Sequence, residues 1–512
     1  MKRAFLVVAC AGALAASALP AGATPRFGAA EDAPKYVWDG GNSLYWAMNT
    51  LGMSVNRITV RWDPAQPDTI PERQYLDRMM PVAAARGIQV MMAVYPLGAW
   101  ALSDNPDLRI GQFAAYLQEL ARTYPQVRDF IVGNEPNQPY FLQPQFGPNG
   151  EVVSAAVYER MLAAAYDALK AVNPGITVIA GGPSGSGNGQ TSSAPVYFLQ
   201  ALGAAYRASG RTTPIMDRLA FHIYPQQNSD PPDRSYAWPH AGAADLDRLK
   251  QAVWDAFNGT GQPTFGEGAS AGAPGTLTFT IDEFGWQAAV DPGHAGAYFG
   301  SENVDAVSED QQAQDYSQLI GMLSCDPTVS DLLVFHLVDE GDLDRFQSGI
   351  FRADSSPRPA FDAVKNAIAA AGSCPLPHLW THASGVVGAQ PTFDVRNAPV
   401  QRAVYGLSAT SAEPAEGTAG IFRIASQTVR PQVDAITRSL AGSVATKPVL
   451  SVQKEVKAGY TPRFELRGKL RAGLYVYAVR LVSEANPARS QTFVSAPFRV
   501  GQPPAKKAAS SR

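Results

Sequence analysis

The 512-residue sequence has few charged residues and no long run of one charge. Asp, Glu, Lys and Arg make up 17% of the chain, below the ~25% of a typical soluble protein, and the formal net charge is −3. Binding to the phosphates of nucleic acid depends on clustered Lys and Arg, which this chain lacks. We therefore expect no nucleic-acid partner.

Long apolar runs are also absent beyond the N-terminus, where no segment approaches the ~18 apolar residues that cross a bilayer. The N-terminus itself begins Met1-Lys2-Arg3, continues with an apolar stretch from Ala4 to Leu19, and ends in the small-residue pattern Ala21-Gly22-Ala23. This arrangement is typical of a secretory signal peptide. We predict cleavage after residue 23, secretion to the periplasm or medium, and no membrane insertion of the mature protein.

The chain has only three cysteines. Cys10 lies within the predicted signal peptide, where a lipid anchor is the weaker alternative. After cleavage Cys325 and Cys374 remain, an even number in a compartment that permits disulfides. We predict that they pair, and two buried free thiols are the alternative.

Residues 24–374 show eight apolar, strand-like runs that alternate with helical patterns. Strict alternation predicts parallel strands, and eight units favour closure into a (β/α)8 TIM barrel of the α/β class. Clear helical patterns span 75–86, 110–123, 155–172 and 311–323. The predicted strands lie near 26–31, 54–60, 88–94, 128–134, 176–181, 217–223, 277–283 and 331–337.

Long segments rich in Gly, Pro and aromatic residues follow strands four, six and seven, at 137–150, 226–243 and 287–308. Loops of this kind gather at the carboxyl-end face of a barrel, where barrel active sites lie. The glycine-rich segment Gly181–Gly189 lacks the spacing and the Lys of a phosphate-binding loop. We interpret it as a flexible loop at the same face.

The pattern changes after the barrel. Pro375 and Pro377 open a predicted linker, 375–385, and residues 386–501 predict a small antiparallel, Ig-like β-sandwich. Residues 502–512 are expected to be a disordered tail. The expected sandwich strands include 420–424, 463–466, 473–481 and 492–499. Its aromatic residues are expected to pack in the core, and sugar binding by this domain is the weaker alternative: Tyr405, Tyr460, Tyr475 and Tyr477.

Two glutamates stand where a strand ends and carry the main functional hypothesis. Glu135 follows the fourth predicted strand and Glu283 ends the seventh, so both should reach the same mouth of the barrel. A pair of carboxyl groups about 5 to 5.5 Å apart can cleave a glycosidic bond with retention, one as acid and base and the other as nucleophile. We assign acid/base catalysis to Glu135 and nucleophilic attack to Glu283.

Four nearby residues fit this chemistry. Asn134 could hydrogen-bond a sugar hydroxyl next to the reacting carbon. His222 and Tyr224 share a face of strand six, and the Tyr224 hydroxyl could orient Glu283 and favour its ionised form. Arg57 or Arg61, on one face of strand two, could supply a cation beside Glu283. Glu135 is expected to lack such a partner and to remain protonated.

These motifs together resemble the clan A (β/α)8 retaining glycoside hydrolases, the broad group of cellulases, mannanases and xylosidases. The resemblance spans roughly residues 26–373 and rests on three motifs, Asn134-Glu135-Pro136, His222-Ile223-Tyr224 and Ile281-Asp-Glu-Phe-Gly-Trp286. It implies Glu135 as acid/base, Glu283 as nucleophile, Asn134 on the 2-hydroxyl of the sugar, Tyr224 on the nucleophile and Arg57 as the strand-two arginine.

The chain departs from this group at strand eight, where many members carry a tryptophan beneath the reacting sugar. Here the sequence reads Leu332-Leu-Val-Phe-His-Leu-Val-Asp339, so Phe335, His336 or Asp339 should line that wall. Flat aromatic rings stack on the apolar face of a pyranose. The candidate stacking residues are Trp62, Tyr95, Tyr236, Trp238 and Trp286.

No cofactor or metal is required by this mechanism. His378 and His382 lie four residues apart, but no Cys or acid stands near them at ligand spacing, so a position in the linker is favoured over zinc binding. The prediction is a secreted, monomeric β-glycoside hydrolase with a carbohydrate substrate. Two alternatives stay open, a catalytically silent carbohydrate-binding protein and a transglycosylase that uses the same site.

Overall fold

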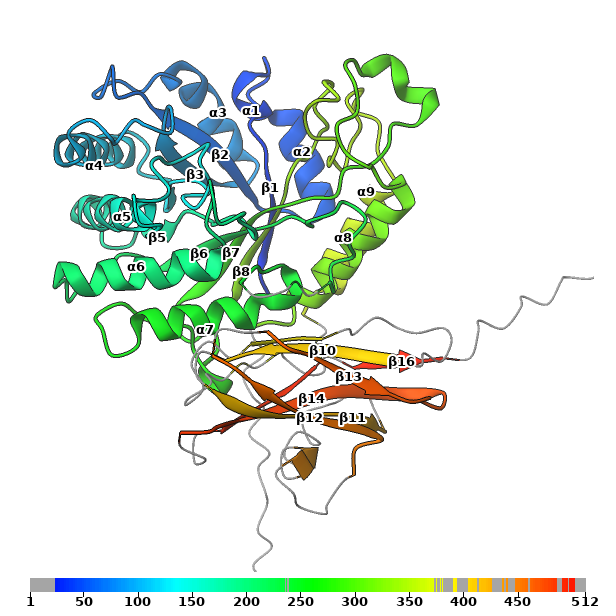
Figure 1. Ribbon diagram of the computed structural model, residues 1–512. Coiled ribbons are helices and arrows are strands. Elements are labelled where there is room, and N and C mark those ends of the chain that lie inside the picture. The colour runs from blue at the N-terminus through cyan, green and yellow to red at the C-terminus, as the bar shows by residue number, and fades with distance from the viewer. Residues whose placement is uncertain are drawn as a thin grey trace, which may run out of the picture.

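A computed structural model shows a closed barrel of parallel strands surrounded by helices, followed by two antiparallel sheets (Figure 1). The structure describes residues 24–234, 236, 239–372, 374, 378, 380, 390–393, 404–411, 414–425, 435–436, 439–440, 447–458, 461–485, 490–495 and 497–501. The predicted signal peptide and tail, and most of the predicted linker, lie outside these residues. None of the helices in the described part is long and apolar enough to cross a membrane.

The eight barrel strands pair in sequence order, and β8 closes the sheet onto β1. This confirms the predicted barrel, and each strand lies within a few residues of its expected position. A small cluster of fully buried side chains fills the barrel interior, among them Met91, Ile131 and Leu333. The strands are β1 (Arg26–Ala30), β2 (Val55–Trp62), β3 (Gln89–Pro96), β4 (Asp129–Val132), β5 (Thr177–Ala180), β6 (Arg218–Ile223), β7 (Thr278–Phe284) and β8 (Val329–Val334).

Amphipathic helices form the outer layer, and their apolar faces pack on the outside of the strands. Ser308 caps α8 by accepting a hydrogen bond from the backbone N–H of Gln311. The helices are α1 (Ala33–Tyr36), α2 (Asn42–Leu51), α3 (Arg73–Ala85), α4 (Pro106–Thr123), α5 (Val153–Val172), α6 (Pro195–Ser209), α7 (Leu246–Phe257), α8 (Glu309–Leu323) and α9 (Ala360–Ala370). Short 3₁₀ turns are η1 (Ala243–Asp245), η2 (Gly268–Ser270) and η3 (Pro292–Ala297).

Strand alternation decides which side chains can reach the site. On β2, Val55 belongs to the interior cluster, whereas Ile58, Val60 and Trp62 belong to the cluster between strands and helices. Successive side chains of a strand point to opposite faces. Arg57 therefore points into the barrel and Trp62 points away from it.

An ionic network closes the N-terminal end of the barrel. Arg26 contacts Asp331 at 2.6 Å and Asp129 at 2.9 Å, and Arg218 contacts Asp331 at 2.9 Å. These residues begin or lie near the start of strands β1, β4, β6 and β8. A site that binds a ligand must therefore lie at the carboxyl-terminal end of the strands.

Strand β7 carries an irregularity next to the predicted nucleophile. Its pairing with β6 shifts between Ala220 and His222, and its pairing with β8 shifts between Ile281 and Phe284. Both shifts place one extra residue on β7, as a β-bulge does. The bulge lets Asp282 and Glu283, although adjacent in sequence, both reach the interior side.

The C-terminal region forms two antiparallel sheets with a shared apolar core, which confirms the predicted sandwich. In Figure 1 these sheets lie on the α7 side of the barrel, while α1, which follows β1, lies at the opposite end. Tyr405, Tyr475 and Tyr477 are buried in this core, as expected, and Tyr460 lies outside the described residues. The strands are β9 (Gln390–Phe393), β10 (Val404–Thr410), β11 (Ala415–Ile424), β12 (Leu450–Val456), β13 (Arg463–Arg467), β14 (Gly473–Ser483), β15 (Ser490–Val494) and β16 (Phe498–Val500).

A disulfide joins Cys325 to Cys374, as predicted, and closes a loop between positions 49 residues apart. It ties the chain that follows α9 to the segment before β8. Near it, the backbone N–H of His378 donates to the carbonyl oxygen of Cys325 at 2.7 Å. The segment after α9 is thereby held against the turn between α8 and β8.

Candidate active site

Glu135 stands on a strained turn at the end of β4. Gly133 has φ 85°, and Glu135 itself has φ 35°, a conformation that residues other than glycine rarely adopt. The turn is held by a hydrogen bond from the N–H of Glu135 to the carbonyl of Gly182 and by one from the N–H of Gln138 to the carbonyl of Glu135. Such strain costs about 1–3 kcal/mol and collects at functional sites.

Glu283 is held from two sides at the end of β7. Arg57 Nη2 lies 2.9 Å from Glu283 Oε1, and the Tyr224 hydroxyl donates to Glu283 Oε2 at 2.9 Å. The same Arg57 Nη2 donates to Asn134 Oδ1 at 2.7 Å. The structure therefore selects Arg57, and Arg61 stacks instead on the ring of Tyr95, at 4.4 Å from its centroid.

His222 connects the two glutamates. Its Nδ1 lies 2.9 Å from Glu135 Oε1 and 3.5 Å from Glu283 Oε2. The two carboxylate oxygens can be no farther apart than the sum of these distances. The expectation that Glu135 lacks a partner was wrong, because β6 brings His222 against the end of β4.

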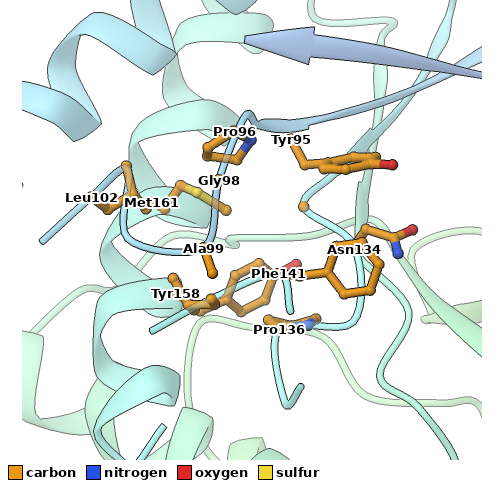
Figure 2. A pocket seen from close by; sticks show the side chains of 12 residues that line it. Tyr95, Pro96, Gly98, Ala99, Leu102, Asn134, Pro136, Phe141, Tyr158 and Met161 are labelled. Carbon is orange, nitrogen blue, oxygen red and sulfur yellow. The ribbon is translucent and has the colours of Figure 1, made fainter. Parts of the chain in front are cut away.

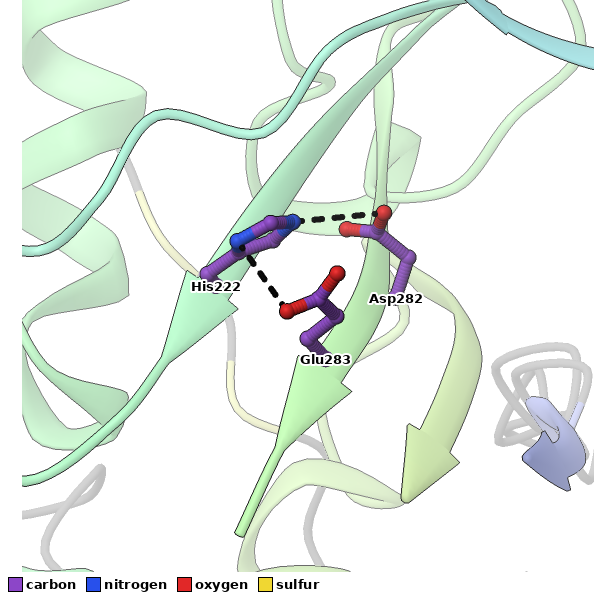
Figure 3. Close-up of side chains that lie close together, drawn as sticks. All are labelled: His222, Asp282 and Glu283. Carbon is purple, nitrogen blue, oxygen red and sulfur yellow. Dashed lines mark ion pairs between the residues drawn. The ribbon is translucent and has the colours of Figure 1, made fainter. Parts of the chain in front are cut away.

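Asp282 completes a buried cluster on the other side of His222, as Figure 3 shows. Its Oδ2 lies 3.4 Å from His222 Nε2 and 3.6 Å from Arg57 Nε. The side chain of Asp282 is fully buried, whereas Glu135 and Glu283 keep 18% and 10% of their side chains exposed. The two glutamates can therefore meet a ligand that Asp282 cannot reach.

The charges in this cluster compensate one another. Burial alone would lower the pKa of Arg57 and of His222, but Glu283 and Asp282 raise both, that of His222 well above its ordinary value. Burial tends to raise the pKa of Asp282, yet His222 and Arg57 lower it. Burial and the adjacent Glu283 raise the pKa of Tyr224, which stays a neutral hydrogen-bond donor. Cations and anions therefore alternate in the site.

Among the residues that the structure describes, two groups of side chains could offer ligand atoms to a metal ion. The first is His222, Asp282 and Glu283, whose atoms lie within 4.8 Å of one another. Arg57 already supplies a cation to both of its carboxylates, so a metal ion there would be repelled. The second, formed by Asp247, Asp326 and His378, is likewise occupied by a cation, since Lys250 Nζ contacts Asp326 at 2.6 Å and Asp247 at 3.1 Å.

Aromatic rings form one wall beside Glu283. The ring centroid of Tyr224 lies 6.0 Å from that of Phe335 and 6.2 Å from that of Phe346. The rings of Phe335 and Phe346 meet edge to face, with their centroids 5.1 Å apart. His336 stacks against Phe335 and has its Nδ1 3.1 Å from the carbonyl oxygen of Ala30. Phe335 and Phe346, with His336 beside them, thus form a wall next to Tyr224, which itself contacts Glu283.

Asp339, the third candidate for that wall, does not line it. Its carboxylate is buried against Arg358, at 2.6 Å, and accepts a hydrogen bond from the Tyr298 hydroxyl at 2.6 Å. Such a fully paired group has no free oxygen to offer a sugar. Asp339 fixes the loop after β8 instead.

Tyr95 stands at the other side of the mouth, in a pocket that it shares with Asn134, Pro136 and Phe141 (Figure 2). Its ring meets Phe141 edge to face at 5.7 Å. Burial raises the pKa of Tyr95, although Arg57 and Arg61 oppose the shift. Tyr95 therefore lies next to Asn134 at the mouth of the barrel.

Two of the other predicted stacking residues, Trp62 and Trp286, are almost fully buried, so those two predictions were wrong. Trp62 is 0% exposed and packs between strands and helices, as its place on β2 requires. Trp286 is 1% exposed, and its indole N–H donates to the carbonyl of Asp230. The Tyr236 hydroxyl donates to the Asp230 carboxylate and accepts from the N–H of Gln226. Trp238 lies outside the described residues.

The Gly181–Gly189 loop lies against the site, at the face of the barrel where it was expected. Asn137 donates from its side chain to the carbonyls of Ser184 and Ser193 and accepts from the N–H of Ser184. A Cβ at Gly182 would lie 2.8 Å from His222 Cδ2, so only glycine leaves room for the imidazole. Loop backbone thus supports the ring that connects the glutamates.

The comparisons with known proteins give no match by sequence: no protein-family model matches the chain, and no curated protein does. Solved structures are similar at low identity. A family 39 glycoside hydrolase from Bacteroides cellulosilyticus WH2 is 16% identical, with a TM-score of 0.46 over 83% of this chain and 78% of that one. A monomeric beta-xylosidase from Caulobacter crescentus CB15 is 14% identical, with a TM-score of 0.42 over 90% and 96%. A GH5_18 protein from Streptomyces cattleya, in complex with GlcNAc, is 18% identical, with a TM-score of 0.44 over 69% and 82%.

Sequence reasoning missed two residues of the site, Asp282 and Phe346. In a regular strand Asp282 would point away from the interior that Glu283 faces, and its inward direction depends on the bulge in β7. Phe346 lies in the loop after β8, where no periodic pattern fixes its direction. The functional interpretation therefore rests on the geometry of the cluster itself.

Proposed function

We propose that the chain is a retaining β-glycoside hydrolase that acts by double displacement. The observation that carries this proposal is the convergence of Glu135 Oε1 and Glu283 Oε2 on the single nitrogen His222 Nδ1, at 2.9 and 3.5 Å. Retaining enzymes keep their two carboxyl groups about 5–5.5 Å apart, and inverting enzymes about 6.5–9.5 Å; two carboxyl groups that contact one nitrogen fit the shorter separation better. The pair therefore suits direct attack better than activation of a water on the opposite face.

Glu283 acts as the nucleophile in this proposal. Arg57 and Tyr224 stabilise its ionised form and fix its two oxygens, so that one of them faces the anomeric carbon. As the glycosyl bond forms, the charge of the carboxylate decreases, while Arg57 remains paired with Asp282. The covalent glycosyl-enzyme is then open to attack by water.

Glu135 acts first as acid and then as base. It protonates the leaving oxygen while Glu283 attacks, and it takes a proton from the incoming water in the second step. Asn134 Oδ1 is engaged with Arg57, so its NH₂ group is the part that donates to the hydroxyl next to the reacting carbon. This hydrogen bond strengthens as positive charge develops on the ring.

In this proposal the reacting sugar packs on the aromatic wall of Phe335, His336 and Phe346. The ring of Tyr95 is the proposed stacking surface on the other side of the barrel mouth. Poly- or oligosaccharides are the substrate class that these flat surfaces suit. No metal or cofactor takes part in the proposed reaction.

The proposal is tested by replacing the two glutamates separately. Glu283→Ala should abolish cleavage of every accepted aryl glycoside, and azide should restore turnover with an inverted, α-configured glycosyl azide as product. Glu135→Ala should slow substrates with poor leaving groups far more than activated ones. Glu151→Ala, at an exposed glutamate in the loop after β4, is the control and should behave as the parent. Parental turnover by Glu283→Ala would show that the nucleophile is misassigned.

The same experiments separate the alternatives. A carbohydrate-binding protein without activity would bind oligosaccharides tightly and turn over no member of a broad glycan panel. A transglycosylase would form longer products at high acceptor concentration, because a sugar hydroxyl replaces water at the glycosyl-enzyme.

We further propose that the protein is exported and acts as a monomer. The disulfide between Cys325 and Cys374 supports export, since such bonds persist in oxidising compartments. Intact mass of the exported protein should show loss of residues 1–23, and light scattering should give the mass of one mature chain. A cytoplasmic protein that retains its N-terminus would contradict the export proposal.

A further inference from the structure

The proposed mechanism gives no role to the buried carboxylate of Asp282. Its side chain is 0% exposed, and neither of its oxygens accepts a hydrogen bond from the residues that the structure describes. A buried carboxylate is costly unless cations compensate it. The compensation comes from two sides, His222 Nε2 at 3.4 Å and Arg57 Nε at 3.6 Å.

A scaffolding role explains Asp282 poorly. A carboxylate retained for structure would accept backbone or side-chain hydrogen bonds, as Asp331 does from Thr280 and Arg218. Asp282 instead offers its charge to Arg57 and to the His222 ring, which also touches Glu135. Its link to Glu135 passes through that ring.

The charges around the ring favour the imidazolium form. The groups that face His222 are Glu135 from the end of β4, Asp282 and Glu283 from β7, and Tyr224 from its own strand, with Arg57 on β2 behind the β7 acids. With Glu283 and Asp282 ionised, the charges of Arg57 and His222 balance them only when His222 is protonated. The raised pKa of His222 agrees with this balance.

The state of the ring decides where the proton of Glu135 lies. In imidazolium both nitrogens carry hydrogen, so Nδ1 donates to Glu135 Oε1, which favours that oxygen as the carbonyl oxygen of the protonated carboxyl group. The proton then belongs on Oε2, the oxygen left for the substrate. If the ring were neutral with its hydrogen on Nε2, Nδ1 would accept the proton of Glu135 and turn it away from the leaving group.

We propose that Asp282 is a positioning residue, which keeps His222 doubly protonated and so directs the acidic proton of Glu135 toward the glycosidic oxygen. This inference rests on the proposed function for its kinetic consequence. Its structural part, the double protonation of His222, does not depend on any substrate.

The first test measures the ring itself. The chain has only six histidines, so ¹⁵N-histidine labelling with His222→Gln as the assignment variant identifies the signal of His222. In the parent both ring nitrogens should carry hydrogen at about pH 7 and above, and Asp282→Asn should lower the titration midpoint by about one pH unit or more. A parent ring with a single hydrogen at pH 7 would overturn the proposal even if no variant folds.

The second test measures the acid step. Asp282→Asn should lower kcat/KM about 10- to 100-fold for glycosides with poor leaving groups and about threefold or less for activated aryl glycosides. Asp331→Asn, a buried aspartate at the opposite end of the barrel, is the matched control and should leave both the His222 titration and this ratio unchanged. Equal losses on both substrate types would assign Asp282 a merely structural role.

The two tests also separate this inference from the proposed function. If no glycoside is cleaved by the parent, the proposed function fails while the titration of His222 still decides the charge state. If the parent cleaves glycosides and Asp282→Asn keeps both the titration and the substrate ratio, only the positioning role fails.

Discussion

Replacing Arg57 tests whether its contacts stabilise the site. It is 4% exposed, donates to Asn134 at 2.7 Å and pairs with Glu283 at 2.9 Å through the same Nη2. Arg57→Met removes this cation but keeps much of the side-chain volume. The variant leaves the buried carboxylates of Asp282 and Glu283 without their shared partner.

The expected loss follows from the burial of the pair. Removing one partner of a buried ion pair costs about 3–5 kcal/mol of stability, because the remaining charge stays uncompensated. At about 2–4 °C per kcal/mol for a domain of 150–250 residues, and less for a larger barrel, the midpoint of thermal unfolding should fall by at most roughly 6–20 °C. If the interaction is also made in the transition state, the same free energy corresponds to about 2–4 orders of magnitude in kcat/KM.

Arg57→Lys and Arg61→Met complete the experiment. Lysine keeps the charge but lacks the planar fork that reaches Asn134 and Glu283 together, so its losses should be intermediate. Arg61 lies on the same face of β2 but stacks on Tyr95, a contact of about 0.5–1 kcal/mol, and should cost little stability. Differential scanning fluorimetry and kcat/KM on one aryl glycoside measure both effects. An Arg57→Met protein as stable and as active as the parent would refute the assigned geometry.

Two further predictions concern the end of the barrel. Replacing Cys325 and Cys374 by Ser should lower the free energy of unfolding by up to about 4 kcal/mol, since the loop spans 49 residues, and the parent under reducing conditions should show the same loss in urea unfolding. An unchanged unfolding midpoint would contradict it. His378, paired with Asp247 at 2.8 Å, has a raised pKa because of that carboxylate, so its contribution is fully present below the ordinary histidine pKa and is lost as pH rises through the raised value. Since both side chains are about half exposed, His378→Gln should cost at most about 1 kcal/mol near pH 5.5 and nothing near pH 9, and an equal cost at both pH values would argue against the ion pair.

The barrel could be predicted because its strands are buried on both faces and read as continuous apolar runs. Phe130-Ile-Val132 and Leu332-Leu-Val334 are examples, and each is fully or almost fully buried. The sandwich was predicted less completely. Strand β12 is largely exposed, with polar residues at most positions, and β10 is interrupted by Gly406 and Ser408, so both lack the apolar signal that marks a strand.

The glutamate pair could be predicted because a strand end fixes the direction of its last side chains. The error over Trp62 came from ignoring strand alternation, since a residue five positions from Arg57 must face the opposite side. Trp286 follows the last residue of β7 by two positions, and no local pattern shows that it turns into the helix layer.

The links within the cluster could not be predicted from local patterns. His222 meets Glu135 because β6 and the turn after β4 lie on the two sides of β5 at the barrel mouth. Asp282 reaches the interior because β7 carries one extra residue in its pairing with β6. Both depend on the register between strands that are distant in sequence. The residue types therefore indicated the chemistry of the site, but they did not indicate which of its side chains contact one another.

The central claim, that Glu283 forms a covalent bond with the sugar, is tested most directly by trapping that bond. A 2-deoxy-2-fluoro glycoside with a good leaving group slows the second step more than the first, so the glycosyl-enzyme accumulates. Mass spectrometry of the digested protein should then place one sugar on Glu283, within Thr278–Trp286. A stable sugar adduct on any other residue, or turnover of natural substrates with inversion, would contradict the account.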